Sequence, residues 1–359
     1  MVIVKFPMIA KIFSRKIMTL AAILSLILIT VTQVQAQPAP YYQGKTIRLI
    51  VGSPTGGLYD QYARILARAM PRHIPGNPEI IVQNMPGGGS LVASNYVYGL
   101  AKPDGLTIGM VGSGVYLDQL LGRNEVKYDV RRFVWLGSVD QRDLLLYVRA
   151  DTPWKSVDDL FTTAEPPKCG STGGTADLTA IMTTVLEEAL GLKFKIVSGY
   201  QGGNAIDLAF QRGEVNCRAT GFTTHFSREP FLTWHKEGFD RHLVQSGNKR
   251  DARVPDAPTV QELMEKKKTP EIGRRVARVM LLSGTLGRPM LAPPNLPADR
   301  TQILREAYLK AFGEPDVIAE AKSSRLEIQT LSGEEVEIQM REAVNQPREV
   351  VERVKKLSE

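Results

Sequence analysis

Residues Ile47–Asp60 carry the stretch I-R-L-I-V-G-S-P-T-G-G-L-Y-D, which decides the fold class of this chain. A β-rich apolar run leads into a turn with two glycines, and the residues that follow place apolar side chains at helical spacing. Strand, glycine turn and helix form the unit that builds parallel sheets flanked by helices. The turn also predicts an anion site, because the first N–H groups of a helix lack internal partners and glycine lets a ligand approach them closely.

The same pattern continues toward residue 115. Residues 79–83 (E-I-I-V-Q) predict a strand, residues 84–90 (N-M-P-G-G-G-S) a loop, and residues 91–100 a helix. A third strand is expected at 106–111, and the turn Gly112-Ser113-Gly114 follows it. Because open α/β sheets hold ligands at the carboxyl ends of their strands, we expect these loops to lie at one edge of one sheet.

A second alternating set begins at Lys168 and predicts a second α/β domain with loops of its own. A glycine-rich turn at 171–175 precedes a helix expected over 177–190, and the strand 194–197 precedes the loop 198–204. A further strand is expected at 214–220. Between the two sets, the continuous apolar run Leu144–Val148 is of the kind that is buried in the middle of a structure.

The composition is that of a globular protein, and 359 residues suggest two domains. The net charge of +7 includes four basic residues among the first 36, which contain no acid. The remaining 41 basic and 38 acidic residues are too evenly balanced and dispersed to indicate nucleic-acid binding.

The N-terminus has the features of a secretory signal peptide. Basic residues precede the apolar run Ile17–Val31, and Val34-Gln35-Ala36 places small or apolar residues at the −3 and −1 positions of a cleavage site. Because the apolar run is shorter than a spanning helix, we expect cleavage after Ala36; an uncleaved signal anchor is the alternative. The mature protein is expected to be soluble, exported to the periplasm and monomeric.

Motifs of known enzyme classes are incomplete in this sequence. Gly44-Lys45-Thr46 precedes a strand, and Ala39 stands where a phosphate-binding loop needs its first glycine. Neither Ser113 nor Ser171 lies in a G-x-S-x-G elbow. The four histidines show no metal-binding spacing, and His235 and His242 are expected on exposed surface. We therefore predict a binding protein without catalytic residues, cofactor or metal.

The chain resembles the periplasmic receptors of tripartite tricarboxylate transporters, the Bug family, over nearly all of its mature length. The opening signature of that family is an apolar strand, a G-G turn and an aspartate, which stand here as Ile47–Val51, Gly56-Gly57 and Asp60. Its glycine loop, its P-D-G-x-T segment and several shorter motifs occur in the family's order: Asn84–Ser90, Pro103–Thr107, Ser156–Leu160, Gly170-Ser171, Tyr200–Gly202 and Pro255–Thr259.

This resemblance implies an α/β fold of the type II periplasmic-binding-protein kind. The fold is a two-lobed clamshell, and each lobe is a mainly parallel sheet flanked by helices. We expect lobe 1 to comprise residues 41–143 plus 280–359 and lobe 2 to comprise residues 144–279, with hinge crossings at 144–148 and near 279–291.

The resemblance also implies a ligand, a small organic acid held between the lobes by backbone N–H groups. The receptor would deliver this acid to integral-membrane transporter subunits. A receptor for a membrane sensor, or an exported serine hydrolase using Ser113 or Ser171, are the alternatives. The residues expected to bind the ligand are Ser53, Thr55, Gly56, Gly57, Asp60, Gly87, Gly88, Gly89, Ser90, Ser113, Ser171, Thr172, Thr175, Tyr200 and Gly202.

The two cysteines, Cys169 and Cys217, could form one disulfide in an oxidising compartment. The resemblance places them on adjacent strands of the second lobe. Parallel neighbouring strands give poor bridging geometry, so two separate buried thiols are the expectation and a disulfide is the alternative.

Overall fold

The computed structural model describes residues 39–141, 143–172, 177–200 and 203–358 of the chain. The expected signal peptide lies outside these residues. Residues Tyr42–Glu359 form one compact unit, to which every element below belongs. None of the helices in the described ranges combines the length and the apolar character that crossing a membrane requires.

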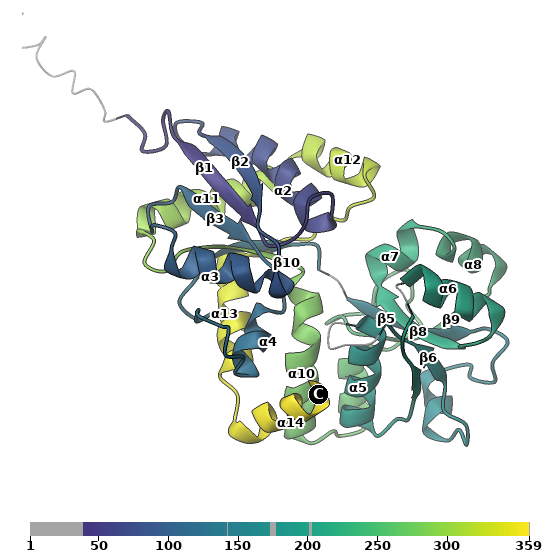
Figure 1. Ribbon diagram of the computed structural model, residues 1–359. Helices are drawn as coiled ribbons and strands as arrows, with labels where there is room; N and C mark the ends of the chain where they lie inside the picture. Colours follow the sequence, from purple (N-terminus) through teal and green to yellow (C-terminus); the bar gives the residue numbers. More distant parts are fainter. Residues whose placement is uncertain (1–38, 142, 173–176, 201–202, 359) are drawn as a thin grey trace, which may run out of the picture. The chain divides into compact units, whose positions relative to one another are not determined.

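The first sheet has six strands in the order β11-β4-β10-β3-β1-β2 (Figure 1). Strand β1 is parallel to both β2 and β3, whereas β10 is antiparallel to β3 and β4, and β11 is antiparallel to β4. The strands are β1 (Thr46–Val51), β2 (Glu79–Asn84), β3 (Thr107–Met110), β4 (Val134–Val139), β10 (Arg288–Ala292) and β11 (Leu331–Ser332).

Helices cover this first sheet on both faces. All residues of β3 and β10 are buried, as central strands with two covered faces require. Helix α2 follows β1 directly, and its buried positions recur at helical spacing, as the opening stretch predicts. The helices are α2 (Leu58–Ala69), α3 (Leu91–Gly99), α4 (Val115–Leu120), α11 (Ala298–Phe312), α12 (Pro315–Ser323) and α13 (Gly333–Val344).

The second sheet has five strands in the order β7-β6-β8-β5-β9. Strand β6 is parallel to β7 and β8, and β5 is antiparallel to β8 and β9. The strands are β5 (Leu144–Arg149), β6 (Lys168–Gly170), β7 (Lys195–Val197), β8 (Cys217–Gly221) and β9 (Asp240–Gln245). The predicted α/β class, two sheets flanked by helices, is confirmed. Both sheets mix parallel and antiparallel pairs, so the expectation of mainly parallel sheets is wrong.

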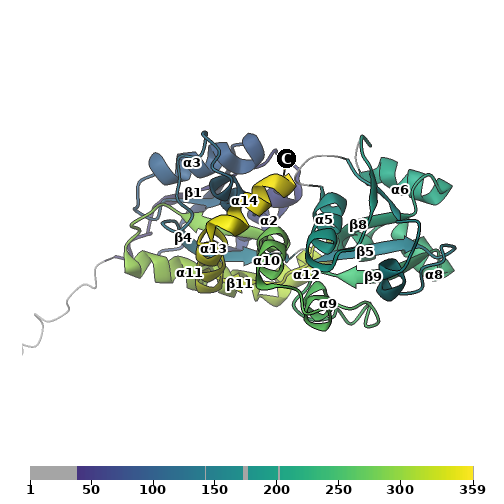
Figure 2. The same ribbon diagram turned by 90° about the horizontal axis from the view of Figure 1, so that it is seen from below.

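Side chains of β5 alternate between two cores, as the period of a strand dictates. Leu144, Leu146 and Val148 belong to the core shared with α5 (Leu178–Leu190). Tyr147 lies on the opposite face, in an aromatic cluster with Phe210, Phe231 and Trp234. The helices of that face are α6 (Gly203–Arg212), α7 (Phe222–Ser227) and α8 (Phe231–Glu237), and Figure 2 shows α5 and α6 on opposite sides of the sheet.

The chain passes between the two sheets twice. It leaves the first sheet after β4 and enters the second at β5, so the crossing lies at residues 140–143 and not in the apolar run 144–148, which is a strand. It returns through α10 (Glu271–Leu286) into β10. Helix α14 (Arg348–Ser358) contacts α10 near the end of the chain (Figure 2).

Cys169 and Cys217 form a disulfide, so the expectation of two separate thiols is wrong. The two residues are direct partners in the parallel pairing of β6 and β8, with Cα atoms 4.2 Å apart. Equal height and a shared face, which a sequence does not reveal, are provided here by the strand register.

Candidate ligand-binding site

A cavity of about 820 Å³ lies where the loops after β1, β2 and β3 meet. Those loops contribute residues 52–54, 86–90 and 112–114, which confirms that the three loops share one edge of the sheet. The opposite wall consists of residues from α5 and α10, together with the end of α14: Leu178, Ala180, Ile181, Thr184, Met280, Ser283, Leu357 and Ser358.

Ser90 joins the three loops. Its Oγ donates a hydrogen bond to the carbonyl of Gly52 (2.9 Å) and accepts one from the N–H of Gly112 (2.8 Å). A side chain at Gly52 would collide with Ser90, so the loops can pack this closely only with glycine there. Ser90 is 4% exposed and lines the cavity, but its hydroxyl is engaged in holding the loops together.

The second loop presents backbone to the cavity. Gly88 has a φ of 54°, in the left-handed region that favours glycine. It begins a 3-10 turn, Gly88–Ser90, that leads into α3. The first N–H groups of such a turn have no acceptor within it and are suited to an anion.

Asp60 positions the first loop. Its buried carboxylate accepts hydrogen bonds from the N–H of Gly56 (2.8 Å), from Arg64 Nε (2.9 Å) and from Asn84 Nδ2 (3.0 Å). The same Asn84 amide donates to the carbonyl of Ser53 (3.0 Å). The hydrogen bond from Arg64 is the main reason that the pKa of Asp60 lies below its usual value. Asp60 thus connects the first loop to the end of β2 and is absent from the described cavity wall.

Of the other first-loop candidates, Ser53 lines the cavity, whereas Thr55, Gly56 and Gly57 are exposed and do not. Gly57 has a φ of −75°, and an added Cβ would come no closer than 3.5 Å to its nearest neighbour, Pro54 O. Structure therefore gives no steric reason for glycine at 57. Gly87, Gly88, Gly89 and Ser113 all lie in the wall, as expected from sequence.

The candidates from the second sheet are arranged differently. Ser171 is fully buried and pairs through its N–H with Val197 O (3.0 Å), and Thr172 bonds through N–H and hydroxyl to Asp177, the N-cap of α5. Tyr200 packs with the aromatic cluster on β5. None of these three is in the described wall, and Thr175 and Gly202 lie outside the described residues.

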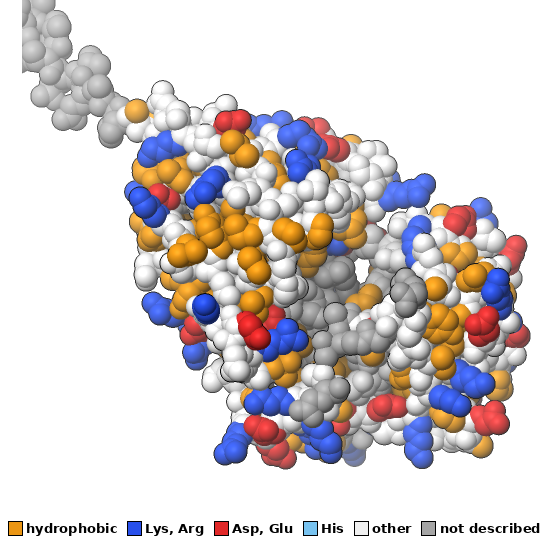
Figure 3. Space-filling model, in the orientation of Figure 1, with side chains coloured by type: hydrophobic (Ala, Val, Ile, Leu, Met, Phe, Trp, Pro, Cys, Tyr) orange, Lys and Arg blue, Asp and Glu red, His pale blue; other side chains and the backbone are white. Residues whose placement is uncertain are grey.

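Charged side chains contribute little positive charge to the described wall. It contains two, Asp118 and Arg123, and these pair with each other (3.0 Å). Figure 3 shows acidic and basic side chains interspersed over this face of the molecule. A bound anion would therefore depend on backbone N–H groups, in agreement with the glycine loops.

Sequence patterns missed part of this wall. Tyr59, Met280 and Ser283 line the cavity, although nothing in their local sequence marks them as site residues. Helix α10, which carries Met280 and Ser283, follows the second sheet in the chain and reaches the loops only through the tertiary fold.

Another hollow, of about 880 Å³, lies beside α11 and α13. Three of its four arginines are already paired, since Arg305 contacts Glu334 and Glu337 (3.1 Å), Arg341 contacts Glu337 (2.8 Å) and Arg131 contacts Asp129 (2.8 Å). The cavity at the strand ends is the better candidate, because three glycine-containing loops meet there.

The histidines are also placed differently from the expectation. The side chains of His235 and His242 are only 21% and 22% exposed, so the prediction of exposed surface positions is wrong. Both converge with His225 on Asp240, away from the cavity wall described above.

Comparisons with known proteins agree with this architecture. The family model described as tripartite tricarboxylate transporter family receptor matches residues 62–355. A UPF0065 protein in the gbd 5′ region of Cupriavidus necator is 28% identical over 287 residues, 79% of each chain. Among solved structures, a TctC solute-binding protein from Polaromonas, without ligand, is similar with a TM-score of 0.69 and 19% identity, covering 88% of this chain and 98% of that one. MatC from Rhodopseudomonas palustris, with bound malate, has a TM-score of 0.52 and 19% identity, covering 88% and 99%.

Proposed function

Because this chain belongs to the tripartite tricarboxylate transporter receptor family, we propose that it captures a small organic acid and delivers it to the membrane subunits of such a transporter. The observation that carries this proposal is the meeting of three glycine-containing loops at one cavity of about 820 Å³. Malate bound to MatC supports a carboxylate as the ligand class.

The ligand carboxylate would be held by the second loop and its neighbours. N–H groups at the start of a helical turn carry partial positive charge without a bulky side chain. The apolar part of the ligand would contact Tyr59, Leu117 and Ile181 in the same cavity. We assign direct contacts to Ser53, Ser113 and residues 87–90, and a loop-positioning role to Asp60.

The lobes are proposed to comprise residues 41–143 plus 280–359, and residues 144–279. The two sheets draw their strands from 46–139 with 288–332, and from 144–245, which supports this division. Ligand binding would close the lobes around the cavity. Small-angle scattering should show a smaller radius of gyration in saturating ligand; an unchanged radius would contradict closure.

We propose that the protein acts in the periplasm after cleavage behind Ala36. The family consists of periplasmic receptors, and the N-terminal sequence pattern supports export. The mass of the protein recovered from periplasm distinguishes cleavage after Ala36 from retention of residues 1–36.

A non-catalytic role is favoured over a serine hydrolase. The chain's four histidines are all described: three surround Asp240, and His73 contacts Glu314. None of them is therefore available as the base for Ser113 or Ser171 in this arrangement.

The function is tested by thermal unfolding of the mature protein with mono-, di- and tricarboxylates and aromatic acids. A ligand that binds only the folded state raises the midpoint in a concentration-dependent way. We expect at least one carboxylate to do so, and its amide analogue not to. If no carboxylate raises the midpoint while a neutral or cationic compound does, the proposed ligand class is wrong.

A further inference from the structure

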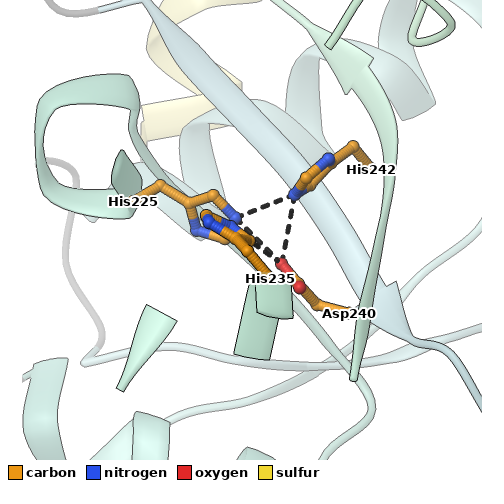
Figure 4. Close-up of side chains that lie close together, drawn as sticks. All are labelled: His225, His235, Asp240 and His242. Atoms are coloured by element: carbon orange, nitrogen blue, oxygen red, sulfur yellow. Dashed lines mark hydrogen bonds and ion pairs between the residues drawn. The ribbon is translucent and has the colours of Figure 1, made fainter. Parts of the chain in front are cut away.

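Three of the four histidines of this chain meet at one buried aspartate in the second sheet. His225 lies in α7, His235 in the last turn of α8, and Asp240 and His242 in β9 (Figure 4). The ligand atoms of these four side chains all lie within 4.8 Å of one another. The cluster is separate from the wall of the proposed carboxylate cavity.

The fold brings these residues together in simple steps. Asp240 and His242 are two residues apart in β9, so their side chains point to the same face of the sheet. That face also carries Tyr147, the partner of His242 on β5. A β-bulge directly after His242 shifts the register of the pairing with β5, which resumes at Val244 and Leu146. Helices α7 and α8 then place His225 and His235 over the same face, with the His225 ring 4.4 Å from the Tyr147 ring.

Hydrogen bonding alone does not satisfy this arrangement. His225 Nε2 lies 2.9 Å from Asp240 Oδ2 and 3.0 Å from His242 Nε2, which lies 3.1 Å from the same oxygen. Each imidazole nitrogen carries at most one hydrogen. If both nitrogens carry one, two N–H groups oppose each other across the His225–His242 contact. If only one nitrogen lacks a hydrogen, its lone pair faces the carboxylate oxygen of Asp240. If both lack one, their lone pairs also face each other.

A cation removes this conflict, because all the atoms can then present lone pairs to one centre. Tetrahedral Zn²⁺ with bonds of ~2.0–2.1 Å holds its ligand atoms ~3.3 Å apart. The three contacts above are close to that separation, and His235 Nε2 stands 3.7 Å from Asp240 Oδ2. We propose that His225, His235, Asp240 and His242 bind one Zn²⁺ ion.

The surroundings are those of an enclosed site. The side chains of His225 and Asp240 are 0% and 1% exposed. Aromatic rings surround the cluster: Phe231 lies 4.8 Å from the His225 ring, and Phe226 lies 4.9 Å from the His235 ring. Asp240 Oδ1 and His235 Nε2 are buried and have no hydrogen-bond partner among the described residues. Buried polar atoms of this kind call for an unseen partner.

The donor atoms of the cluster are one carboxylate and three imidazoles. That set suits Zn²⁺ and other borderline divalent metals better than Ca²⁺ or Mg²⁺, which prefer oxygen ligands alone.

Four protein ligands make a closed, structural site. Helices α7 and α8 have six and seven residues, too few to be stable alone, and β9 is an edge strand of its sheet. One ion would fasten both helices to that edge. The expected role is to stabilise this part of the second sheet, independently of carboxylate binding.

The test uses the mature protein, purified without a histidine tag, stripped with chelator and titrated with Zn²⁺ alone. Calorimetry should give one ion per chain, and Zn²⁺ should raise the thermal midpoint. Co²⁺ should give the visible absorption of a tetrahedral site. His235→Gln and His242→Gln remove partly exposed ligands and should lower Zn²⁺ affinity at least ~100-fold, since even outer-shell changes cost 10–100-fold.

His73→Gln is the matched control, because it removes the one histidine outside the cluster. It should bind Zn²⁺ as tightly as the wild type. If a cluster variant fails to fold, hydrogen exchange of the wild type decides: added Zn²⁺ should slow exchange in 222–242 and leave 58–69 unchanged. The proposal is overturned if the wild-type protein binds no stoichiometric Zn²⁺, or if the variants at 235 and 242 bind Zn²⁺ as tightly as the wild type.

Discussion

Asp140 and Arg288 form a buried ion pair that joins the two places where the chain passes between its sheets. Asp140 directly follows β4, and Arg288 begins β10. Their side chains are 3% and 1% exposed, and the Arg288 guanidinium lies over the rings of Tyr59 (5.1 Å) and Tyr62 (4.8 Å). The pair thus links both crossings to α2, the helix behind the first glycine loop.

Arg288→Met should lower the free energy of unfolding by about 3–5 kcal/mol, because it leaves the buried carboxylate of Asp140 without its counter-charge. Urea unfolding followed by circular dichroism measures this change. Asp140→Asn combined with Arg288→Met should cost less than the sum of the two single changes, since the double variant leaves no buried charge.

Arg275→Met is the matched control for this pair. Arg275 bonds Glu271 (3.0 Å) one turn away on the exposed side of α10, and its loss should cost less than ~1 kcal/mol. Equal losses for Arg275→Met and Arg288→Met would show that burial of the Asp140 pair has no energetic consequence.

The variants Gly88→Val and Gly57→Val compare two glycines of the predicted site. The backbone conformation requires glycine at position 88 but not at position 57. Gly88 needs a positive φ, which a β-branched residue adopts only under strain. Calorimetry with the identified carboxylate should show affinity at least tenfold lower for Gly88→Val, at a cost of about 1–3 kcal/mol in local strain. Gly57→Val should bind within about threefold of wild type, since position 57 has an ordinary φ and space for a side chain. Reversal of this order would exclude the second loop as the anion clamp.

Asp60 predicts a pH dependence of stability. Its pKa in the folded protein lies below the unfolded value of about 3.9, mainly through Arg64, so its ionised form stabilises the fold above that pH. This stabilisation is lost as the pH falls through the folded pKa. Asp60→Asn should therefore cost roughly 1–3 kcal/mol at pH 7 and clearly less at about pH 3.5. Asp256→Asn is the control, because Asp256 is exposed. An equal cost of Asp60→Asn at both pH values would contradict the assignment.

Local signals were sufficient for the part of the fold that repeats strand, glycine turn and helix. Strands β1 and β2 and helix α5 occur where their sequence patterns predict them. Strand β10 was missed because Arg288-Pro289-Met290 contains a proline, which normally argues against a central strand. The proline is tolerated beside a bulge at Met290/Leu291, in a pairing that depends on residues about 150 positions earlier.

The candidate site was predictable only in part. The loops at 87–90 and 112–114 follow strands directly, so their meeting at one sheet edge was expected. The wall from α5 and α10 depends on how the two sheets pack together, which no local pattern encodes. The cluster at Asp240 was missed for the same reason: its histidines come from two short helices and a strand with no regular spacing.

The disulfide should raise the free energy of unfolding, and both reduction and mutation should reveal this contribution. Cys169 and Cys217 connect β6 to β8 across a separation of 48 residues, so the bond restricts the unfolded chain. Cys169→Ser with Cys217→Ser should lower the free energy of unfolding by about 2–4 kcal/mol, and reductant should destabilise the wild type but not the double variant. Because Ser171 and Thr172 lie only two and three residues after Cys169, hydrogen exchange in that segment should also accelerate. Intact mass of the non-reduced, denatured protein after thiol alkylation provides the decisive control: two alkylated cysteines would show that the bond is absent from the mature protein.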